Sequence, residues 1–445
     1  MAYLNSSESL IRDDDIQRTG KEPALNEHLL EKVLSPENLQ TAWKRVRRNK
    51  GAPGIDGMSI EAFPEFMKDY WLPIILPSLQ DGSYQPNPVR RSIIEKDDGG
   101  KRMLGIPTIL DRLIMQAIAR VLSPLYEPNF SEFSYGFRPE RSQHMAIKHV
   151  RECIKDGRKI AVDVDLSKFF DRVNHDYLMT KLGAKIKDKA LLSLIGKYLR
   201  AGIMDNNGQY FESLVGVPQG SPLSPLLSNI VLDELDKELE RRGHQFARYA
   251  DDFIILVRSQ RAGKRVLGSV TKFVQNRLHL LVNDQKSRVV PIKQSKFLGF
   301  SFKGKWLIWH PKAINKFKRE VRILTKRSWG VSMEFRIKEL NQYLVGWINY
   351  FGIANHFQQC KDLDCWIRRR IRQCFWKQWR KVRTKVRNLL KLGVMKELAV
   401  ACGMSSKSYW HSSKTEGINK GLSNEYLKEL GLTSLTERWI VIHYG

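Results

Sequence analysis

Two short apolar segments in the middle of the chain carry acidic residues where a core strand would normally be apolar. Residues 160–166 read Ile-Ala-Val-Asp-Val-Asp-Leu, and because Asp163 and Asp165 are two positions apart they point to the same side of a strand. Asp251 and Asp252 are adjacent and precede a continuous run of five apolar residues. The pattern predicts two buried strands, with Asp251 and Asp252 at or beside the tip of a β-hairpin.

Most other apolar positions repeat with a helical period. They predict helices over the ranges 61–80 (broken by Pro73 and Pro77), 111–126, 142–156, 176–200, 226–242, 262–280, 334–351 and 362–390. A basic β-hairpin is expected over 89–107, and an alternating strand over 297–302. The order of these elements indicates an α+β protein with an antiparallel sheet in the middle of the chain and a helical region after it.

The charge balance points to a polyanionic partner. The 445 residues include 75 Lys and Arg against 47 Asp and Glu, a formal net charge of +28. Nucleic acid is preferred over an anionic membrane surface, because the sequence shows neither a basic amphipathic membrane helix nor a lipidation signal. No apolar run approaches the roughly 18 residues of a transmembrane helix.

The positive charge is concentrated late in the chain. Residues 303–391 contain 23 Lys and Arg but 5 Asp and Glu. A solvated basic helix face is the usual interpretation, but solvated faces normally mix signs, and unrelieved positive charge favours a neighbouring phosphate backbone. The candidate nucleic-acid-binding residues on the helix predicted over 362–390 are Arg368, Arg369, Arg370, Arg372, Lys377, Arg380, Lys381 and Arg383.

The cysteines favour a reducing compartment. The chain has five, an odd number, and none of them forms the C-x₂-C pair that is typical of zinc sites. Four scattered histidines (His279, His310, His356 and His411) also lack metal-ligand spacing, so we expect no nuclease cassette of the His-Asn-His type. A bacterial, cytoplasmic protein associated with nucleic acid is the expectation.

The acidic clusters suit divalent cations. An isolated Asp-Asp pair is most often a solvated turn, but here apolar segments flank the pair and a second acid-bearing strand precedes it by some 90 residues. Mg²⁺ is bound by few carboxylates together with phosphate and water oxygens. One carboxylate from the first strand and two from the hairpin would hold two ions about 3.5–4 Å apart, an arrangement that supports in-line attack of a hydroxyl on a phosphate.

At these residues the chain resembles a known family. Tyr249-Ala250-Asp251-Asp252 is similar to the active-site box of reverse transcriptases encoded by bacterial group II introns, and the resemblance runs from about residue 39 to the C-terminus. The family's first acidic box reads acid, three residues, two aromatics, acid. That spacing occurs only from Asp165 to Asp171, so the resemblance assigns Asp165, Asp251 and Asp252 as the catalytic ligands of two Mg²⁺ ions and leaves Asp163 a structural role.

Further motifs follow in the family's order. The resemblance assigns nucleotide binding to Lys96 and Arg102 in the basic hairpin, to Phe170, to Gln219 of a Pro-Gln-Gly motif and to Lys286. Phe170 would block a 2′-hydroxyl and so favour deoxynucleotides. Arg138, in a Tyr-Gly-Phe-Arg-Pro turn, matches the motif beneath the template strand.

The resemblance also implies a domain order. The stretch 340–351, Leu-Asn-Gln-Tyr-Leu-Val-Gly-Trp-Ile-Asn-Tyr-Phe, is similar to the thumb, or maturase, domain of the family. The expected fold is a right-hand polymerase of fingers and palm, an all-helical thumb and a small DNA-binding region. The expected parts are a loose extension (1–28), the N-terminal extension and fingers (29–160), the palm (161–302), the thumb (303–391) and the DNA-binding region (392–445).

The predicted function is RNA-dependent DNA polymerisation together with intron maturation, in a compact form without an endonuclease domain. The expected partners are group II intron RNA, an RNA template with a DNA primer, target DNA and deoxynucleoside triphosphates, and the oligomeric state stays open. Two alternatives stay open as well. One is an RNA-binding maturase that acts in splicing alone, and the other is a related reverse transcriptase recruited to DNA repair or phage defence.

Overall fold

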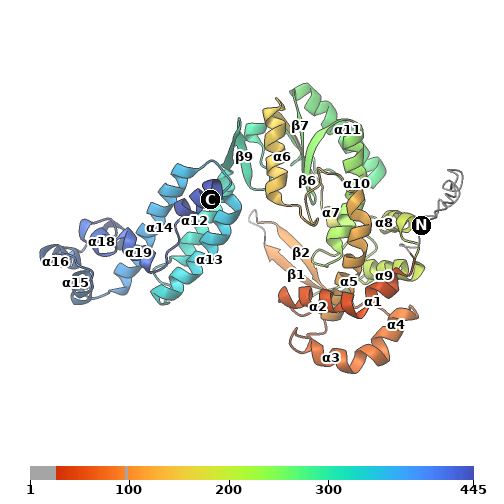
Figure 1. Cartoon of the computed structure of the whole chain (residues 1–445), viewed down its shortest axis with the longest axis horizontal. Coiled ribbons are helices and arrows are strands. Elements are labelled where there is room, and N and C mark those ends of the chain that lie inside the picture. Colours follow the sequence, from red (N-terminus) through yellow and green to blue (C-terminus); the bar gives the residue numbers. More distant parts are fainter. Residues whose placement is uncertain (1–26, 96–98) are drawn as a thin grey trace, which may run out of the picture. The chain divides into compact units, whose positions relative to one another are not determined.

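The computed structural model describes residues 27–95 and 99–445, so most of the predicted loose extension and Lys96 lie outside the described residues (Figure 1). The contacts divide the chain into two compact units. Among the described residues, unit 1 comprises 27–95 and 99–132 with 166–238 and 271–282, and unit 2 comprises 133–165, 239–270 and 283–445. Each unit is therefore assembled from three separate stretches, across the linear boundaries that the sequence predicts.

Unit 2 contains a four-stranded antiparallel sheet, called the palm sheet below, and this confirms the predicted antiparallel sheet. Its strands, in the order β6-β7-β3-β8, are β6 (Gln245–Tyr249), β7 (Asp252–Val257), β3 (Ile160–Asp165) and β8 (Arg288–Pro291). Helix α6 (Gln143–Lys155) packs against β6 and β7. On α11 (Gln260–Leu278), Gly263 lies against Ile160 and Val162, which point to the side of β3 opposite the acids.

A short hairpin follows the palm sheet. It consists of β9 (Phe300–Lys303) and β10 (Trp306–Trp309). The strand predicted over 297–302 is wrong for its first three residues, because Leu298 and Gly299 both have positive φ values (49° and 83°) and form a tight turn. Phe297 is nevertheless buried and bridges Phe300, which explains its apolar character.

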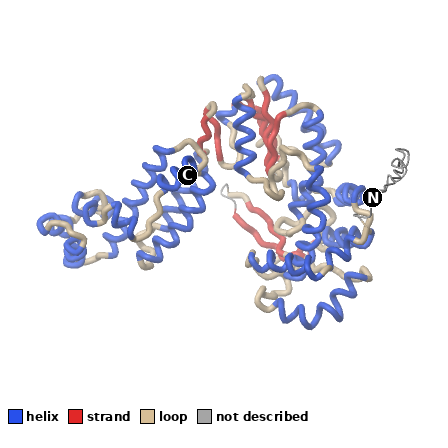
Figure 2. The backbone as a smooth tube through the Cα atoms, viewed as in Figure 1, coloured by secondary structure: helices blue, strands red, loops and turns tan. Residues whose placement is uncertain are grey.

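The rest of unit 2 is helical, as the sequence predicts, and is called the helical region below (Figure 2). Its helices are α12 (Pro311–Leu324), α13 (Met333–Phe351), α14 (Phe357–Gln378), α15 (Val382–Lys391), α16 (Lys396–Met404), α17 (Tyr409–Ser412), α18 (Glu416–Gly421), α19 (Asn424–Glu429) and α20 (Leu435–Tyr444). The single helix predicted over 362–390 is wrong. It breaks at Trp379, whose ring packs back on Phe375 and Trp376 of the preceding turn.

Unit 1 contains a second sheet, in the order β2-β1-β4-β5. Strands β1 (Val89–Glu95) and β2 (Lys101–Ile106) form the predicted basic hairpin, and β1 also pairs in parallel with β4 (Ile203–Met204), which the sequence did not indicate. Strand β5 is Tyr210–Phe211. The helices of this unit are α1 (Leu29–Leu34), α2 (Pro36–Arg48), α3 (Phe63–Tyr70), α4 (Leu76–Gln80), α5 (Ile109–Tyr126), α7 (Phe169–Arg172), α8 (His175–Lys185) and α9 (Lys189–Arg200), with most of α10 (Ser224–Arg241).

Two helix predictions in unit 1 need correction. Residues 176–200 form two helices, because the side chain of Asp188 accepts a hydrogen bond from Leu191 N and starts α9 afresh. Residues 61–80 are not interrupted at the prolines. A π-helical turn, Trp71–Ile75, contains Pro73 and joins α3 to α4, since one wide turn removes the hydrogen bond that a proline cannot make.

Two further findings concern the cysteines and the apolarity of the helices. All five cysteines are free thiols. Within 27–95 and 99–445, none of the helices has the length and apolarity that crossing a bilayer requires.

Candidate active site

The hairpin that carries two of the predicted acids is held from within the protein by Arg248. Tyr249 pairs with Asp252, so the β6–β7 turn consists of Ala250 and Asp251, and Ala250 has a φ of 60°. Arg248 is fully buried, and its guanidinium donates to Ala250 O (3.0 Å) and to Ser134 Oγ (2.7 Å). These bonds stabilise a backbone conformation that a residue with a side chain rarely adopts.

The loop formed by residues 133–136 packs closely against the same turn. Arg248 N donates to Phe133 O (2.9 Å), and Tyr135 N donates to Arg248 O (2.8 Å), so residues 133–135 run beside β6. A Cβ on Gly136 would lie 2.2 Å from Ala250 N, so only glycine fits there. The predicted template residue Arg138 is largely buried and donates to Ser134 O (2.8 Å), which ties it to this loop and leaves little of it exposed for a template strand.

The structure places the three predicted catalytic acids at the same end of the palm sheet. Asp165 and Asp252 are directly opposite each other in the antiparallel register of β3 and β7, and Asp251 is the residue before β7. Directly opposed residues on antiparallel strands have Cβ atoms about 4.5–5.5 Å apart. The register therefore forces two like charges to be neighbours, with a third at the turn.

The electrostatics of Asp252 reflect this crowding. Its side chain keeps solvent-accessible surface at the hairpin, yet loss of solvation around the carboxyl, together with the charges of Asp251 and Asp163, raises its pKa to about 7. The ammonium of Lys296 acts in the opposite direction, and the charge of Asp165 adds to the rise. An excess of negative charge therefore lies at the end of the palm sheet.

These residues fit divalent metal ions. Among the described residues, no three His, Cys, Asp or Glu side chains converge closely enough to form a ready-made metal site. The fit comes from the donors and their electrostatics: carboxylate oxygens are the ligands that Mg²⁺ prefers, and the raised pKa of Asp252 marks negative charge that a cation would neutralise. Asp165, Asp251 and Asp252 are the residues that would hold such ions.

Asp163 lies on the same face but has partners of its own. Its carboxylate accepts from Ser295 Oγ (2.7 Å) and from Arg288 Nε (3.3 Å), while Arg288 Nη2 donates to Gln294 O (3.1 Å). Burial raises the pKa of Asp163, and the hydrogen bond from Ser295 and the charge of Arg288 oppose that rise. This network agrees with the structural role that the resemblance implies for Asp163.

The segment of the predicted nucleotide residue Lys286 is bound to the same strand. Asn283 N donates to Asp165 O (2.8 Å), and Ser287 Oγ accepts from Asp165 N (3.0 Å). Between them the Asn283 side chain accepts from Gln285 N and Lys286 N and closes a tight turn. The turn leaves the Lys286 side chain exposed. Hydrogen bonds from Asn283 and to Ser287 join this turn to the backbone of Asp165, one of the predicted catalytic acids.

Other predicted nucleotide residues belong to unit 1. Phe170 and Gln219 line one cavity of about 590 Å³, together with the cationic side chains of Arg91, Lys168 and Arg172. Gln219 Nε2 also donates to the carboxylate of Asp171 (3.4 Å). The structure thus brings two of the five predicted residues into one pocket, and three cations there were not predicted.

The two adjacent aromatics at this cavity, Phe169 and Phe170, differ in burial. Phe169 is buried, whereas Phe170 is half-buried and packs edge to face on it (5.1 Å between ring centroids). Arg102 is exposed on β2, opposite Ile94 in the register.

The predicted basic face in the helical region divides into two groups. Lys377, Arg380, Lys381 and Arg383 are exposed. The other four arginines instead donate hydrogen bonds within the protein. Arg372 is buried and donates to Leu422 O (2.8 Å) and Asn424 Oδ1 (3.1 Å). The remaining bonds are Arg370 to Thr325 Oγ1, Arg369 to Trp410 O (2.9 Å) and Arg368 to Cys365 Sγ (3.2 Å). The helical stripe of 3.6-residue period could not reveal this, because the covering residues come from other helices.

A group of three cations, called the Tyr409 cluster below, was missed by the sequence analysis. Arg327, Lys377 and Lys385 lie 5.3, 5.3 and 5.7 Å from the centroid of the Tyr409 ring. The Lys385 ammonium is also 4.8 Å from the Trp376 ring, and its side chain is buried. Arg327 is 50 residues before Lys377, and Tyr409 is 24 residues after Lys385, so no local pattern groups these cations around the ring. Their mutual repulsion favours a bound anion.

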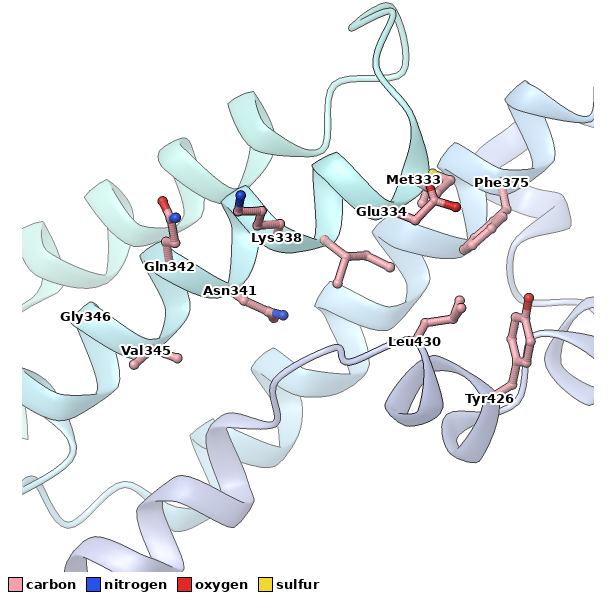
Figure 3. Close-up of a pocket in the computed structure, with 11 residues that line it drawn as sticks. Met333, Glu334, Lys338, Asn341, Gln342, Val345, Gly346, Phe375, Tyr426 and Leu430 are labelled. Atoms are coloured by element: carbon pink, nitrogen blue, oxygen red, sulfur yellow. The ribbon is translucent and has the colours of Figure 1, made fainter.

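A groove of about 800 Å³ runs along α13 and was also unforeseen (Figure 3). Lys338, Asn341 and Gln342 line it from α13, and Tyr426 and Leu430 line it from the C-terminal residues. Asn341 holds this wall in place, since it donates to Gly431 O (2.7 Å) and accepts from Thr433 N (2.9 Å). Four of the twelve residues of the motif over 340–351 (Asn341, Gln342, Val345 and Gly346) line this groove.

Comparison with known proteins identifies the class. Residues 94–302 match the family described as reverse transcriptase (RNA-dependent DNA polymerase), and residues 314–393 match the maturase-specific domain of group II introns. The first match covers the palm sheet and the acid-bearing hairpin, and the second covers most of the helical region. The protein is therefore a reverse transcriptase, and its family implies the use of divalent metal ions.

More specifically, the chain belongs to the group II intron reverse transcriptases and maturases. It is 33% identical over 328 residues to Protein YkfC of Escherichia coli, which covers 64% of this chain and 84% of YkfC. It is 37% identical over 267 residues to the group II intron-encoded protein LtrA of Lactococcus lactis, which covers 59% of this chain but only 43% of LtrA. The chain thus spans less than half of LtrA's length.

Two solved structures show a weaker likeness. A partial Cas6-RT-Cas1–Cas2 complex is 27% identical, with 56% of this chain and 42% of that chain covered and a TM-score of 0.36. Apo telomerase from Candida tropicalis is 13% identical, with 79% and 70% covered and a TM-score of 0.43. TM-scores below 0.5 are too low to establish a shared overall fold.

Proposed function

We propose that this reverse transcriptase copies group II intron RNA into DNA during retrohoming and assists splicing of that RNA. The observation that carries the polymerase part is the cross-strand pair Asp165 and Asp252 with Asp251 beside it, where loss of solvation and then the neighbouring carboxylates raise the pKa of Asp252. The match of residues 314–393 to the maturase-specific domain supports the intron part.

In this proposal each residue has a defined task. Asp165, Asp251 and Asp252 hold two Mg²⁺ ions, which would stabilise the attacking and leaving oxygens of nucleotidyl transfer. Arg248 and Ser287 fix the positions of these acids through the hydrogen bonds described above. Lys286 contacts the nucleotide phosphates, and Phe170 and Gln219 position the sugar and base of a deoxynucleoside triphosphate.

The helical region would hold the RNA. The exposed residues Lys377, Arg380, Lys381 and Arg383, together with the Tyr409 cluster, supply positive charge that a phosphate backbone neutralises. The same surface would hold the RNA template and DNA primer during copying, and the residues after 391 would contact target DNA.

The test is primer extension on an RNA template with deoxynucleotides and Mg²⁺. Wild-type protein is expected to extend the DNA primer, and Asp252→Ala is expected to stop extension while it keeps binding intron RNA. A search of the DNA flanking the gene for a folded group II intron RNA, followed by a splicing assay with any intron found there, then tests the maturase role. Extension by Asp252→Ala at the wild-type rate would refute the catalytic assignment.

A further inference from the structure

Lys296 lies at a place in unit 2 where its charge bears on the catalytic acids. It directly follows Ser295, whose hydroxyl is 2.7 Å from the Asp163 carboxylate, and its own side chain is exposed. Its ammonium lowers the pKa of Asp252, and it also lowers the pKa of His310 after the larger effect of burial. Ser295 therefore joins Lys296 to Asp163, which lies on the same face of β3 as Asp165, and none of the nucleotide motifs includes this lysine.

The backbone before Lys296 is firmly fixed. Ser295 is fully buried, its amide donates to Ile292 O (3.1 Å), and its carbonyl accepts from Ser301 Oγ (3.1 Å). The Asp163 carboxylate accepts a hydrogen bond from Ser295 Oγ. Arg288, which also bonds to Asp163, donates from Nη2 to Gln294 O (3.1 Å). The position of Lys296 is therefore set by hydrogen bonds to β3, the strand that also carries Asp165.

The residues after Lys296 are fixed as well. Phe297 is buried and exchanges backbone hydrogen bonds with Phe300 (3.0 Å each), and Leu298 O accepts from Tyr350 Oη (2.8 Å). No ion pair of Lys296 occurs among the described residues, and two further cations, Lys312 and Arg288, act together with it on His310. An exposed lysine without an acidic partner, on a rigid backbone beside a metal-type acid cluster, suits a phosphate.

We infer that Lys296 binds a phosphate group of the reacting nucleic acid or nucleotide, and that Asp163 is the positioning residue that places it through Ser295. This inference rests on the proposed polymerase function and adds two residues to it. Asp163 in this view contributes geometry through the hydrogen bond from Ser295, and its charge is balanced by Arg288. The phosphate belongs either to the primer–template backbone or to the incoming deoxynucleotide, and these two sources are separable by experiment.

The experiment uses the full chain with Lys296→Gln, Lys296→Arg, Ser295→Ala and the double variant Ser295→Ala/Lys296→Gln. Steady-state primer extension gives KM for the deoxynucleotide and kcat, and fluorescence anisotropy gives Kd for a labelled primer–template without turnover. Lys296→Gln is expected to raise either KM or Kd about tenfold, with kcat nearly unchanged, because it removes one charge-assisted hydrogen bond. A rise in KM identifies the nucleotide as the source, and a rise in Kd identifies the primer–template. Lys296→Arg should restore most of the loss.

The positioning role is tested by non-additivity. If Ser295 acts by placing Lys296, Ser295→Ala should shift the same constant, and the double variant should be no worse than Lys296→Gln by more than about twofold. Asp163→Asn retains an oxygen that accepts from Ser295 and should stay within about threefold of wild type, whereas Asp163→Ala should resemble Lys296→Gln. Shifts that multiply in the double variant, to about a hundredfold, would overturn the positioning role.

Matched controls separate this inference from folding and from the proposed function. Lys293→Gln removes an exposed lysine three residues earlier and should change none of the constants. Thermal unfolding shows whether the buried substitutions Ser295→Ala and Asp163→Ala leave the protein folded. If they do not, the result for Lys296→Gln, a substitution at an exposed residue, decides whether Lys296 contacts phosphate. Unchanged KM and Kd in Lys296→Gln would refute the phosphate contact. A wild-type protein that binds primer–template but never extends it would instead refute the proposed function, and the Kd comparison would still decide Lys296.

Discussion

The palm sheet and the helical region concentrate opposite charges by different means. In the palm sheet, strand register puts Asp165 against Asp252, and backbone bonds from Asn283 and Ser287 fix the first of them. In the helical region, long side chains from three segments lie over one aromatic ring, that of Tyr409. Strand register sets a short, rigid spacing that suits a small cation, whereas lysine and arginine stems give a broader positive field that suits a polyanion.

The largest expected effect comes from removing one of the acidic residues of the palm sheet. Asp252→Ala should lower the rate of primer extension by about 10³-fold or more, since removal of one preorganised electrostatic group at a reacting centre costs about that much. RNA binding, measured by filter retention, should change less than about twofold, because the cationic surface is untouched. Asp362→Ala, at an exposed acid on α14, is the control and should affect neither. Parallel losses of extension and RNA binding would show that the two charged regions are not separate.

The next effect tests how the cationic side is built. Trp376 is 1% exposed and carries the Lys385 ammonium over its ring. Trp376→Ala should lower the free energy of unfolding by about 3–5 kcal/mol through the cavity it leaves. Chemical denaturation measures this, with Trp306→Ala as the matched control, since Trp306 is 53% exposed and should cost under about 0.5 kcal/mol. Equal losses in the two variants would show that Trp376 is not a core residue.

A smaller effect concerns the Tyr409 cluster as a phosphate contact. The pair Arg327→Gln and Lys377→Gln should weaken RNA binding about tenfold at low salt and reduce the slope of log K against log salt by about 1.4, at about 0.7 for each phosphate contact on a single strand. Lys428→Gln is the control, because Lys428 forms an ion pair with Glu437 (2.7 Å) in the same region. A slope that stays at the wild-type value would exclude the cluster from the RNA-binding surface.

The smallest expected effect concerns one hydrogen bond of the palm sheet. Ser287→Ala removes the hydroxyl that accepts from Asp165 N (3.0 Å) and should lower extension about fivefold, consistent with roughly 1 kcal/mol for one hydrogen bond. RNA binding should stay unchanged. Ser269→Ala is the control, because its hydroxyl bonds only within α11, to Val266 O (3.0 Å). A loss in Ser287→Ala no larger than in this control would show that Asp165 does not need the bond.

Much of the site could be predicted because its residues are close in sequence or share a period. Asp251 and Asp252 are adjacent and next to an apolar run, so a hairpin with acids at its turn follows from the pattern alone. Asp165 required the spacing of its own motif, which is again local. The basic hairpin of β1 and β2 and the helices α5, α6 and α13 were predicted on the same grounds, and the structure contains all of them.

Predictions were weaker where distant residues decide the environment. Arg372 and Lys377 were both predicted to bind nucleic acid from the same helix, yet Arg372 is buried and donates to Leu422 O, whereas Lys377 is exposed. The break between α14 and α15 at Trp379 was not predicted either, because neither proline nor glycine occurs at that point of the sequence.

By itself the sequence determined which side chains are candidates for the chemistry, because carboxylates, aromatics and cations at fixed local spacings are read directly along the chain. Only the tertiary structure decided which of them meet: the opposition of Asp165 and Asp252, the buried Arg248 beneath the turn, the Ser295 bond that gives Asp163 its partner, and the three cations around Tyr409. The physical reason is that charge and hydrogen bonding act through space, and residues brought together by strand pairing and helix packing have no short-range signature in the chain.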